Sequence, residues 1–232
     1  MNLTSRAPGP ELMDSETVSE GDFAACLDDL HTVNILTRGA APTLAFLESA
    51  TRDWPGGTPL RVMDCGFGRG DMLRAVHAFA LRRGLEPVLT GLDLNPHSAA
   101  LARARTPAGV VIDWRTGDIF DEPVGAHDFI ISALFAHHLD GDGVTHFVRW
   151  MEASAVRGWF VNDLHRHWLA YHGFRALSTA ARWHRFVRHD GPLSVARAFT
   201  HADWARILSD AGVTGATVRW HLPFRLCVGR LK

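Results

Sequence analysis

The sequence lacks several features that mark membrane, exported or disulfide-stabilised proteins. No apolar run approaches the length needed to cross a bilayer. The first residues, MNLTSRAPGPELMDSE, are polar and contain no apolar stretch, so we expect no signal peptide. Only three cysteines occur among 232 residues, and they are scattered. This cysteine usage predicts reduced thiols in a cytoplasmic protein.

The sequence also lacks a large net charge and local metal-binding motifs. The formal net charge is −1, which predicts no general attraction to nucleic acid or to anionic membranes. The 14 histidines are many, but none stands in a C-x-x-C or H-E-x-x-H arrangement, so we expect no bound metal. The length, with 47% hydrophobic and 21% charged residues, suits one α/β domain with some additions.

The most informative stretch lies between positions 60 and 93, where the pattern predicts a strand, a glycine turn, a helix and a second strand. A short, mostly apolar run ends at Asp64 and predicts a buried strand. Three glycines follow at alternate positions: Gly66, Gly68 and Gly70. A helix over 71–83 and a strand over 88–92 complete half of a nucleotide-binding βαβ unit. Glycines there let the backbone approach a ligand, and the helix start offers free N–H groups.

The glycine spacing separates two cofactors. Dinucleotide enzymes use G-x-G-x-x-G, which would place the third glycine at position 71, where this chain has Asp71. The pattern D-x-G-x-G-x-G, with Asp93 at the end of the next strand, resembles that of the class I S-adenosylmethionine (SAM) dependent methyltransferases. An NAD-dependent oxidoreductase is the less favoured alternative.

The resemblance implies a doubly wound, Rossmann-like α/β fold with a seven-stranded sheet, mostly parallel with a C-terminal antiparallel strand. It implies SAM as the cofactor, with Asp64 and the glycine loop on the methionine part. Asp93 would hold the ribose hydroxyls, because a carboxylate can accept two charge-assisted hydrogen bonds from a diol. Asp118 would contact the adenine amino group, and Ile119 would pack on the ring. The cofactor-binding residues expected in this way are Asp64, Gly66, Phe67, Gly68, Gly70, Asp93, Leu94, Asp118, Ile119, Ser132 and Ala133.

Outside this core the sequence gives coarser predictions. Residues 1 to about 18 should form a loose tail, and with two following helices they make an N-terminal cap over 1–57 before a methyltransferase domain at 58–232. A third strand is expected over Val110–Trp114, and a helix with a capping box at Thr200 and Asp203 should run to position 211.

The segment after the fifth strand is longer than the core fold requires. We expect it to be mostly helical from 165 to about 188, followed by a turn over His189–Pro192. One interpretation of the insertion at about 165–198 is a lid over an apolar acceptor. An extra helix packed on the sheet, with a solvated basic face, explains the pattern nearly as well.

A narrower resemblance involves Asn162–Arg166 and His189–Phe199. These segments are similar to those of short bacterial methyltransferases whose genes often lie beside polyketide synthases of the chalcone-synthase type. The resemblance implies a small phenolic or lipophilic acceptor from secondary metabolism. Nothing in the sequence predicts the oligomeric state.

Methyl transfer to oxygen requires a positioned acceptor that loses a proton, and a neutral imidazole suits that task. His137 and His138 follow the fourth predicted strand, while Asp163 and His165 follow the fifth. Both strand ends meet at the carboxyl edge of the sheet, where the methyl group should lie. His137 is the first choice for the base, because it follows the strand that abuts the methyl donor. Packing by His138 and helix capping by His165 are alternatives.

Two other acceptor classes fit this sequence poorly. Enzymes that methylate nucleic-acid amino groups carry Asn/Asp-Pro-Pro-aromatic after strand four, where this chain has Ser132–Phe135. Catechol-type enzymes bind Mg²⁺ through acids after strands four and five, and here no acid follows strand four before Asp140. We therefore expect O-methylation of a small molecule. A SAM-fold binding protein without catalysis stays open, because an intact cofactor loop argues for binding alone.

Overall fold

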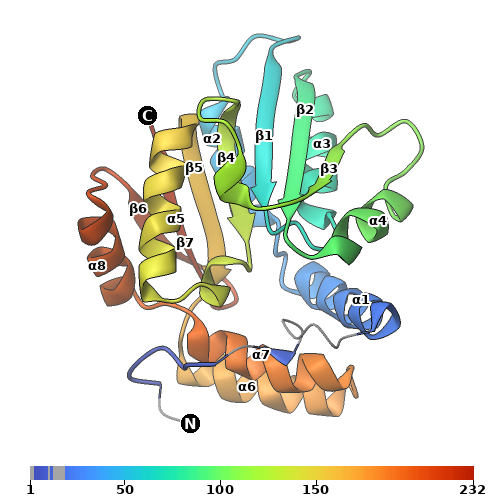
Figure 1. The fold of residues 1–232 in the computed structure, drawn as a ribbon, viewed down its shortest axis with the longest axis vertical. Coiled ribbons are helices and arrows are strands. Elements are labelled where there is room, and N and C mark those ends of the chain that lie inside the picture. The colour runs from blue at the N-terminus through green and yellow to red at the C-terminus, as the bar shows by residue number, and fades with distance from the viewer. Residues whose placement is uncertain (1–2, 10, 13–18) are drawn as a thin grey trace.

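The computed structural model describes residues 3–9, 11–12 and 19–232, and its centre is one sheet between two layers of helices (Figure 1). Seven strands pair in the order β3-β2-β1-β4-β5-β7-β6. Pairing is parallel from β3 through to β5, and β7 is antiparallel to both of its neighbours. This mostly parallel, Rossmann-like sheet confirms the predicted fold class.

The elements have the following bounds. The strands are β1 (Pro59–Cys65), β2 (Glu86–Asp93), β3 (Asp113–Thr116), β4 (His127–Ala133), β5 (Ala155–Leu164), β6 (Thr217–His221) and β7 (Arg225–Leu231). The α-helices are α1 (Glu20–Leu36), α2 (Ala41–Ala50), α3 (Asp71–Arg82), α4 (Pro96–Ala104), α5 (Gly141–Ser154), α6 (Trp168–Ala180), α7 (Arg185–Arg197) and α8 (His201–Ala211). Two short 3₁₀ helices are η2 (Ile119–Asp121) and η3 (Ala136–His138).

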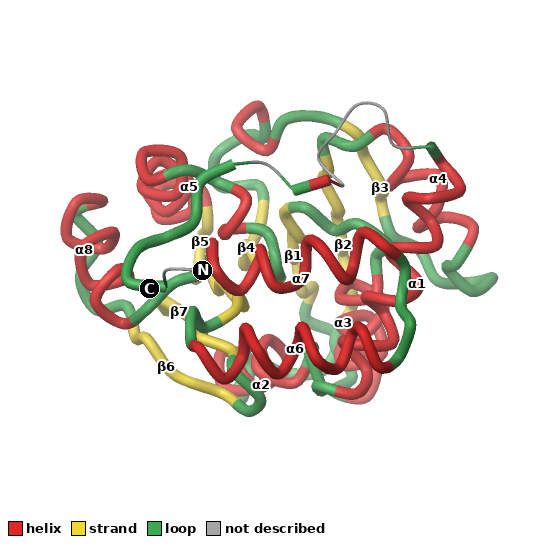
Figure 2. Tube along the Cα trace, turned by 90° about the horizontal axis from the view of Figure 1, so that it is seen from below, coloured by secondary structure: helices red, strands yellow, loops and turns green. Residues whose placement is uncertain are grey.

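Each face of the sheet is buried under its own apolar layer. On one face α5 and α8 pack on β4, β5 and β7, with Phe147, Trp159 and Trp204 fully buried. On the other face α3 packs on β1 and β2, and α2 packs on β5 and β7, through residues such as Val76 and Leu47. Helix α4 packs beside β2 and β3, and α1, α6 and α7 lie across the end of the sheet where β1 and β4 finish (Figures 1 and 2). This carboxyl edge is where doubly wound sheets place their ligands.

Local sequence signals position several of these elements as expected. Helix α3 begins after Gly70, whose φ of 82° is left-handed, and Gly84 follows its end with a φ of 68°. Helix α8 starts with the predicted capping box, in which Thr200 and Asp203 each accept a bond from the other's backbone N–H. The third strand was predicted too early, because Val110 donates its N–H to Pro107 in a turn before β3 starts.

The described part of the N-terminal segment is not the loose tail that its composition predicted. The Arg6 guanidinium donates to the carbonyl oxygens of Leu139 at 2.6 Å, Arg197 at 2.7 Å and His137 at 3.2 Å. Leu12 donates its N–H to Asp190 on α7 at 2.9 Å. We call residues 3–9 and 11–12 the N-terminal strap. Proline and polar residues weaken local structure, but these long-range bonds still fix the strap on the rest of the chain.

The predicted long helical segment is two helices, and the predicted turn at 189–192 is wrong. The break between α6 and α7 falls at about 181–184, where Arg182 has a φ of 53°. Gly191 and Pro192 instead lie inside α7. A Cβ at position 191 would overlap the Phe174 ring of α6, so this glycine permits close helix packing. Within the described part of the chain, no helix is both long and apolar enough to cross a membrane.

Candidate active site

A cavity of about 1410 Å³ opens at the carboxyl edge of the sheet. The glycine loop, the end of β2, η3 and parts of α1, α7 and the strap form its wall. Leu27, Leu30 and Ile35 of α1 make one side apolar. Pockets for single drug-sized ligands measure roughly 300–1,000 Å³. The cavity therefore has room for a cofactor and an acceptor together.

Asp64 is a buried carboxylate on the wall of this cavity. Its side chain is 2% exposed, and Oδ1 has no hydrogen-bond partner among the residues that the structure describes. Burial, and then the charge of Asp93, raise the pKa of Asp64 well above its usual range. Because a buried carboxylate is costly without a partner, this position is suited to a ligand that carries a cation. An ammonium group fits that requirement.

The glycine loop is packed too tightly for side chains at two of its positions. A Cβ on Gly66 would lie 2.5 Å from Phe135, and one on Gly70 would lie 2.5 Å from Trp114. Both residues also have left-handed backbones, with φ of 70° and 82°. The Phe67 ring packs on Trp114 at 4.8 Å between centroids. The loop therefore presents backbone at these two positions, while Phe67 lines the cavity.

Asp93 ties the glycine loop to the end of β2. Its carboxylate accepts the N–H groups of Gly68 and Asn95, each at 2.8 Å. Burial raises the pKa of Asp93, while these two backbone N–H groups lower it in part. The bonds fix the direction of a carboxylate that lines the cavity beside Asp64.

The other predicted cofactor residues divide into two groups. Leu94, Asp118, Ile119 and Ala133 line the same cavity. Gly70 and Ser132 are outside its lining: Gly70 starts α3, and Ser132 is buried within β4. The structure thus brings the two acids, most of the loop and the two adenine candidates to one place.

His137, which also lines the cavity, is held by Asp163. His137 Nδ1 lies 2.6 Å from Asp163 Oδ1, and the His137 backbone N–H donates to Oδ2 at 3.1 Å. Burial alone would raise the pKa of Asp163, but the His137 imidazole and the hydrogen bonds outweigh it and hold that pKa below its usual value. An ionised Asp163 keeps the hydrogen on Nδ1. In the neutral form of His137 the lone pair is then on Nε2.

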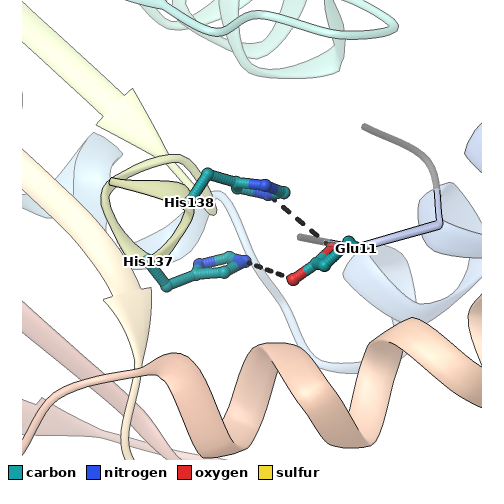
Figure 3. Close-up of side chains that lie close together, drawn as sticks. All are labelled: Glu11, His137 and His138. Atoms are coloured by element: carbon teal, nitrogen blue, oxygen red, sulfur yellow. Dashed lines mark ion pairs between the residues drawn. The ribbon is translucent and has the colours of Figure 1, made fainter. Parts of the chain in front are cut away.

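Sequence reasoning missed Glu11, which lies beside both histidines of η3 (Figure 3). Its side chain is 5% exposed, and Oε1 lies 3.6 Å from Nε2 of His137. Oε2 lies 3.9 Å from Nε2 of His138, and Ser194 donates its hydroxyl to Oε1 at 2.7 Å. No local motif could have identified Glu11, because it is far from the other residues in the sequence.

His165 is placed away from the cavity that His137 and His138 line. Its ring lies 5.6 Å from that of His167 and 6.0 Å from that of His201, measured between centroids. Burial, followed by these imidazoles, lowers the pKa of His165. Of the four predicted catalytic residues, His137, His138 and Asp163 are brought together, whereas His165 belongs to a separate histidine group.

Comparison with known proteins agrees with this geometry. Residues 63–157 match the family model described as a methyltransferase domain. No curated protein matches the chain.

Three solved structures illustrate the likeness in fold. Magnesium protoporphyrin IX methyltransferase from Synechocystis PCC 6803 with bound SAM is 15% identical, with a TM-score of 0.54 over 84% of this chain and 79% of that one. The CMeT domain of the citrinin polyketide synthase is 15% identical, with a TM-score of 0.61 over 83% and 52% of the two chains. A putative O-methyltransferase from Nostoc punctiforme PCC 73102 is 17% identical, with a TM-score of 0.54 over 83% and 56%.

The sheet order and the likeness to these structures therefore show an α/β, Rossmann-like fold of the kind found in methyltransferases. The segment 63–157 carries the methyltransferase domain match, and the two structures of magnesium protoporphyrin IX methyltransferase hold SAM and SAH. The cavity fits SAM, because its wall includes the Asp64 carboxylate, whose Oδ1 has no hydrogen-bond partner among the described residues, and the backbone of Gly66 and Gly68.

Proposed function

We propose that this protein is a SAM-dependent methyltransferase that methylates a hydroxyl oxygen of a small-molecule acceptor. The observation that carries the proposal is the buried Asp64 carboxylate in the same cavity as the oriented His137–Asp163 pair. One end of this cavity suits a cationic cofactor, and the other presents an imidazole held in one tautomer.

The cofactor end would bind SAM through residues that are already in place. Asp64 would accept the ammonium group, and the backbone of the glycine loop would lie along the methionine part. Asp93 would accept the ribose hydroxyls, and Asp118 with Ile119 would hold the adenine. When bound, SAM supplies a methyl group on a sulfonium sulfur. The residues of the chain have to orient it, exclude water and present the acceptor in line.

The lining of the cavity supports an apolar phenol or a related hydroxyl compound as the acceptor. Leu27, Leu30 and Ile35 give the cavity an apolar wall, and the hydroxyl would meet Nε2 of His137. Asp163 fixes the opposite nitrogen, so the imidazole reaches the hydroxyl in a single orientation. In this proposal α6 and α7 are a lid over the acceptor, and α7 reaches the cavity at Ser194.

The test is methyl transfer from SAM labelled in its methyl group to a panel of alkylresorcinols, hydroxynaphthalenes and chalcone-type phenols. We expect label in a methoxy group, with one S-adenosylhomocysteine (SAH) released for each product, and loss of both in Asp64→Asn. Label on carbon would contradict O-methylation. Tight SAH binding without turnover of any phenol in the panel would favour a binding protein over an enzyme.

A further inference from the structure

Three side chains from distant parts of the chain converge at the acceptor end of the cavity. Glu11 comes from the N-terminal strap, and His137 and His138 come from η3 (Figure 3). One oxygen of Glu11 and one nitrogen of each histidine lie within 4.8 Å of one another. Two imidazoles and one carboxylate form a ligand set that Zn²⁺ and Fe²⁺ use in sites with an open coordination position.

Two of these three ligands are oriented from behind by further polar groups. Asp163 Oδ1 lies 2.6 Å from Nδ1 of His137, which leaves Nε2 available for a metal ion. Ser194 donates its hydroxyl to Oε1 of Glu11 at 2.7 Å. Metal-binding histidines usually donate their second N–H to a carboxylate or a carbonyl in this way, and such outer partners fix the geometry of the site. The arrangement is therefore more specific than a chance meeting of polar side chains.

The backbones that carry the ligands are also fixed. Arg197 donates from Nε to the carbonyl of His137 at 3.0 Å, and from a second nitrogen to the carbonyl of His138 at 2.7 Å. It also bonds the carbonyl of Gly9 in the strap. One guanidinium thus joins η3 to the segment that carries Glu11. Since Glu11 and His137 are both almost fully buried, a cation between them would offset the cost of burying the carboxylate.

We propose that Glu11, His137 and His138 bind one divalent transition-metal ion, with an open position toward the cavity. This differs from the expectation of no metal, which rested on local spacing motifs that cannot detect a ligand from the distant strap. Binding of the ion is independent of the proposed function, but its use in catalysis rests on that function. An acceptor hydroxyl bound at the open position would release its proton to water more easily, so the ion would take over the role that the proposed function gives to the His137 lone pair.

The experiment is a calorimetric titration of the chelator-treated, full-length protein with Zn²⁺. We expect one Zn²⁺ per chain, and at least about 10–100-fold weaker binding in His138→Ala and in Glu11→Gln. His165→Ala is the matched control, because it removes a histidine from the separate group and should leave Zn²⁺ affinity unchanged. SAH affinity measured in each variant reports whether the fold is intact. His138 is partly exposed, so its replacement carries the smallest risk to folding.

Each outcome of this titration decides the proposal. Absence of Zn²⁺ binding to the unaltered protein would overturn it. So would a His138→Ala variant that binds Zn²⁺ as tightly as the unaltered protein, or a loss of Zn²⁺ affinity that occurs only in His165→Ala. Zn²⁺ binding without methyl transfer would contradict the proposed function alone. Methyl transfer by protein that binds no Zn²⁺ would contradict this inference alone.

Discussion

Asp64 is the residue on which cofactor binding depends most directly. Its carboxylate must be ionised to hold an ammonium, whereas burial raises its pKa well above the usual range in the free protein. Lowering the pH through that raised pKa protonates Asp64. SAH affinity should therefore begin to fall at a higher pH than it would if Asp64 had the pKa of an ordinary carboxylate. Calorimetry of SAH binding between about pH 8 and pH 5 checks this. Asp64→Asn should bind weakly throughout, and a flat profile in the unaltered protein would show that Asp64 does not hold the ammonium.

His137 is the residue on which turnover should depend. His137→Ala removes the group that Asp163 orients, and the rate of methyl transfer should fall by about 10²–10⁴-fold. SAH affinity should change little, because the cofactor end is formed by other residues. The control is again His165→Ala, which lies outside the cavity lining and should keep the original rate. Equal rates in both variants would show that His137 does not act on the acceptor.

At the scale of the elements, the strap is held chiefly by Arg6. Its guanidinium donates to three carbonyl oxygens, those of His137 in η3, Leu139 directly after η3 and Arg197 in α7, and it lies 4.4 Å from the Phe199 ring centre. Hydrogen bonds from charged groups contribute roughly 1.5–3 kcal/mol each, and partly exposed ones contribute less. Arg6→Ala should therefore lower the free energy of unfolding in urea by about 1–3 kcal/mol. Exposed Arg82 on α3 is the control, and an equal effect of Arg82→Ala would show that the strap contributes nothing specific.

Elements with strong local signals could be predicted from the sequence, and those set by distant contacts could not. Helix α8 has its capping box at Thr200, and α3 lies between Gly70 and Gly84, so both were located nearly to the residue. Gly191 and Pro192 favour a turn by local preference, yet packing against Phe174 keeps them inside α7. The strap was missed for the same reason, since its partners lie on η3 and α7.

At the scale of the whole molecule, one half of the cavity is formed by a continuous stretch of sequence and the other by segments that are far apart in the chain. The cofactor half comes mainly from one continuous stretch, with Asp64 and Asp93 at the ends of adjacent strands, so a motif predicts it. Residues of the strap, η3, β5 and α7 form the acceptor half. Two of its members, His137 and Asp163, could be inferred from strand order, because β4 and β5 are neighbours. Glu11 could not, because its position depends on tertiary contacts of the strap.

The central claim is that this cavity binds SAM and not a dinucleotide. It rests on the buried Asp64 oxygen without a partner in the described structure, and on a third glycine at position 70 instead of 71. The most direct measurement is a pair of calorimetric titrations of the full-length protein, one with SAH and one with NAD. We expect one SAH bound per chain, weaker binding of SAH in Asp64→Asn, and no heat from NAD. Binding of NAD without binding of SAH would contradict it.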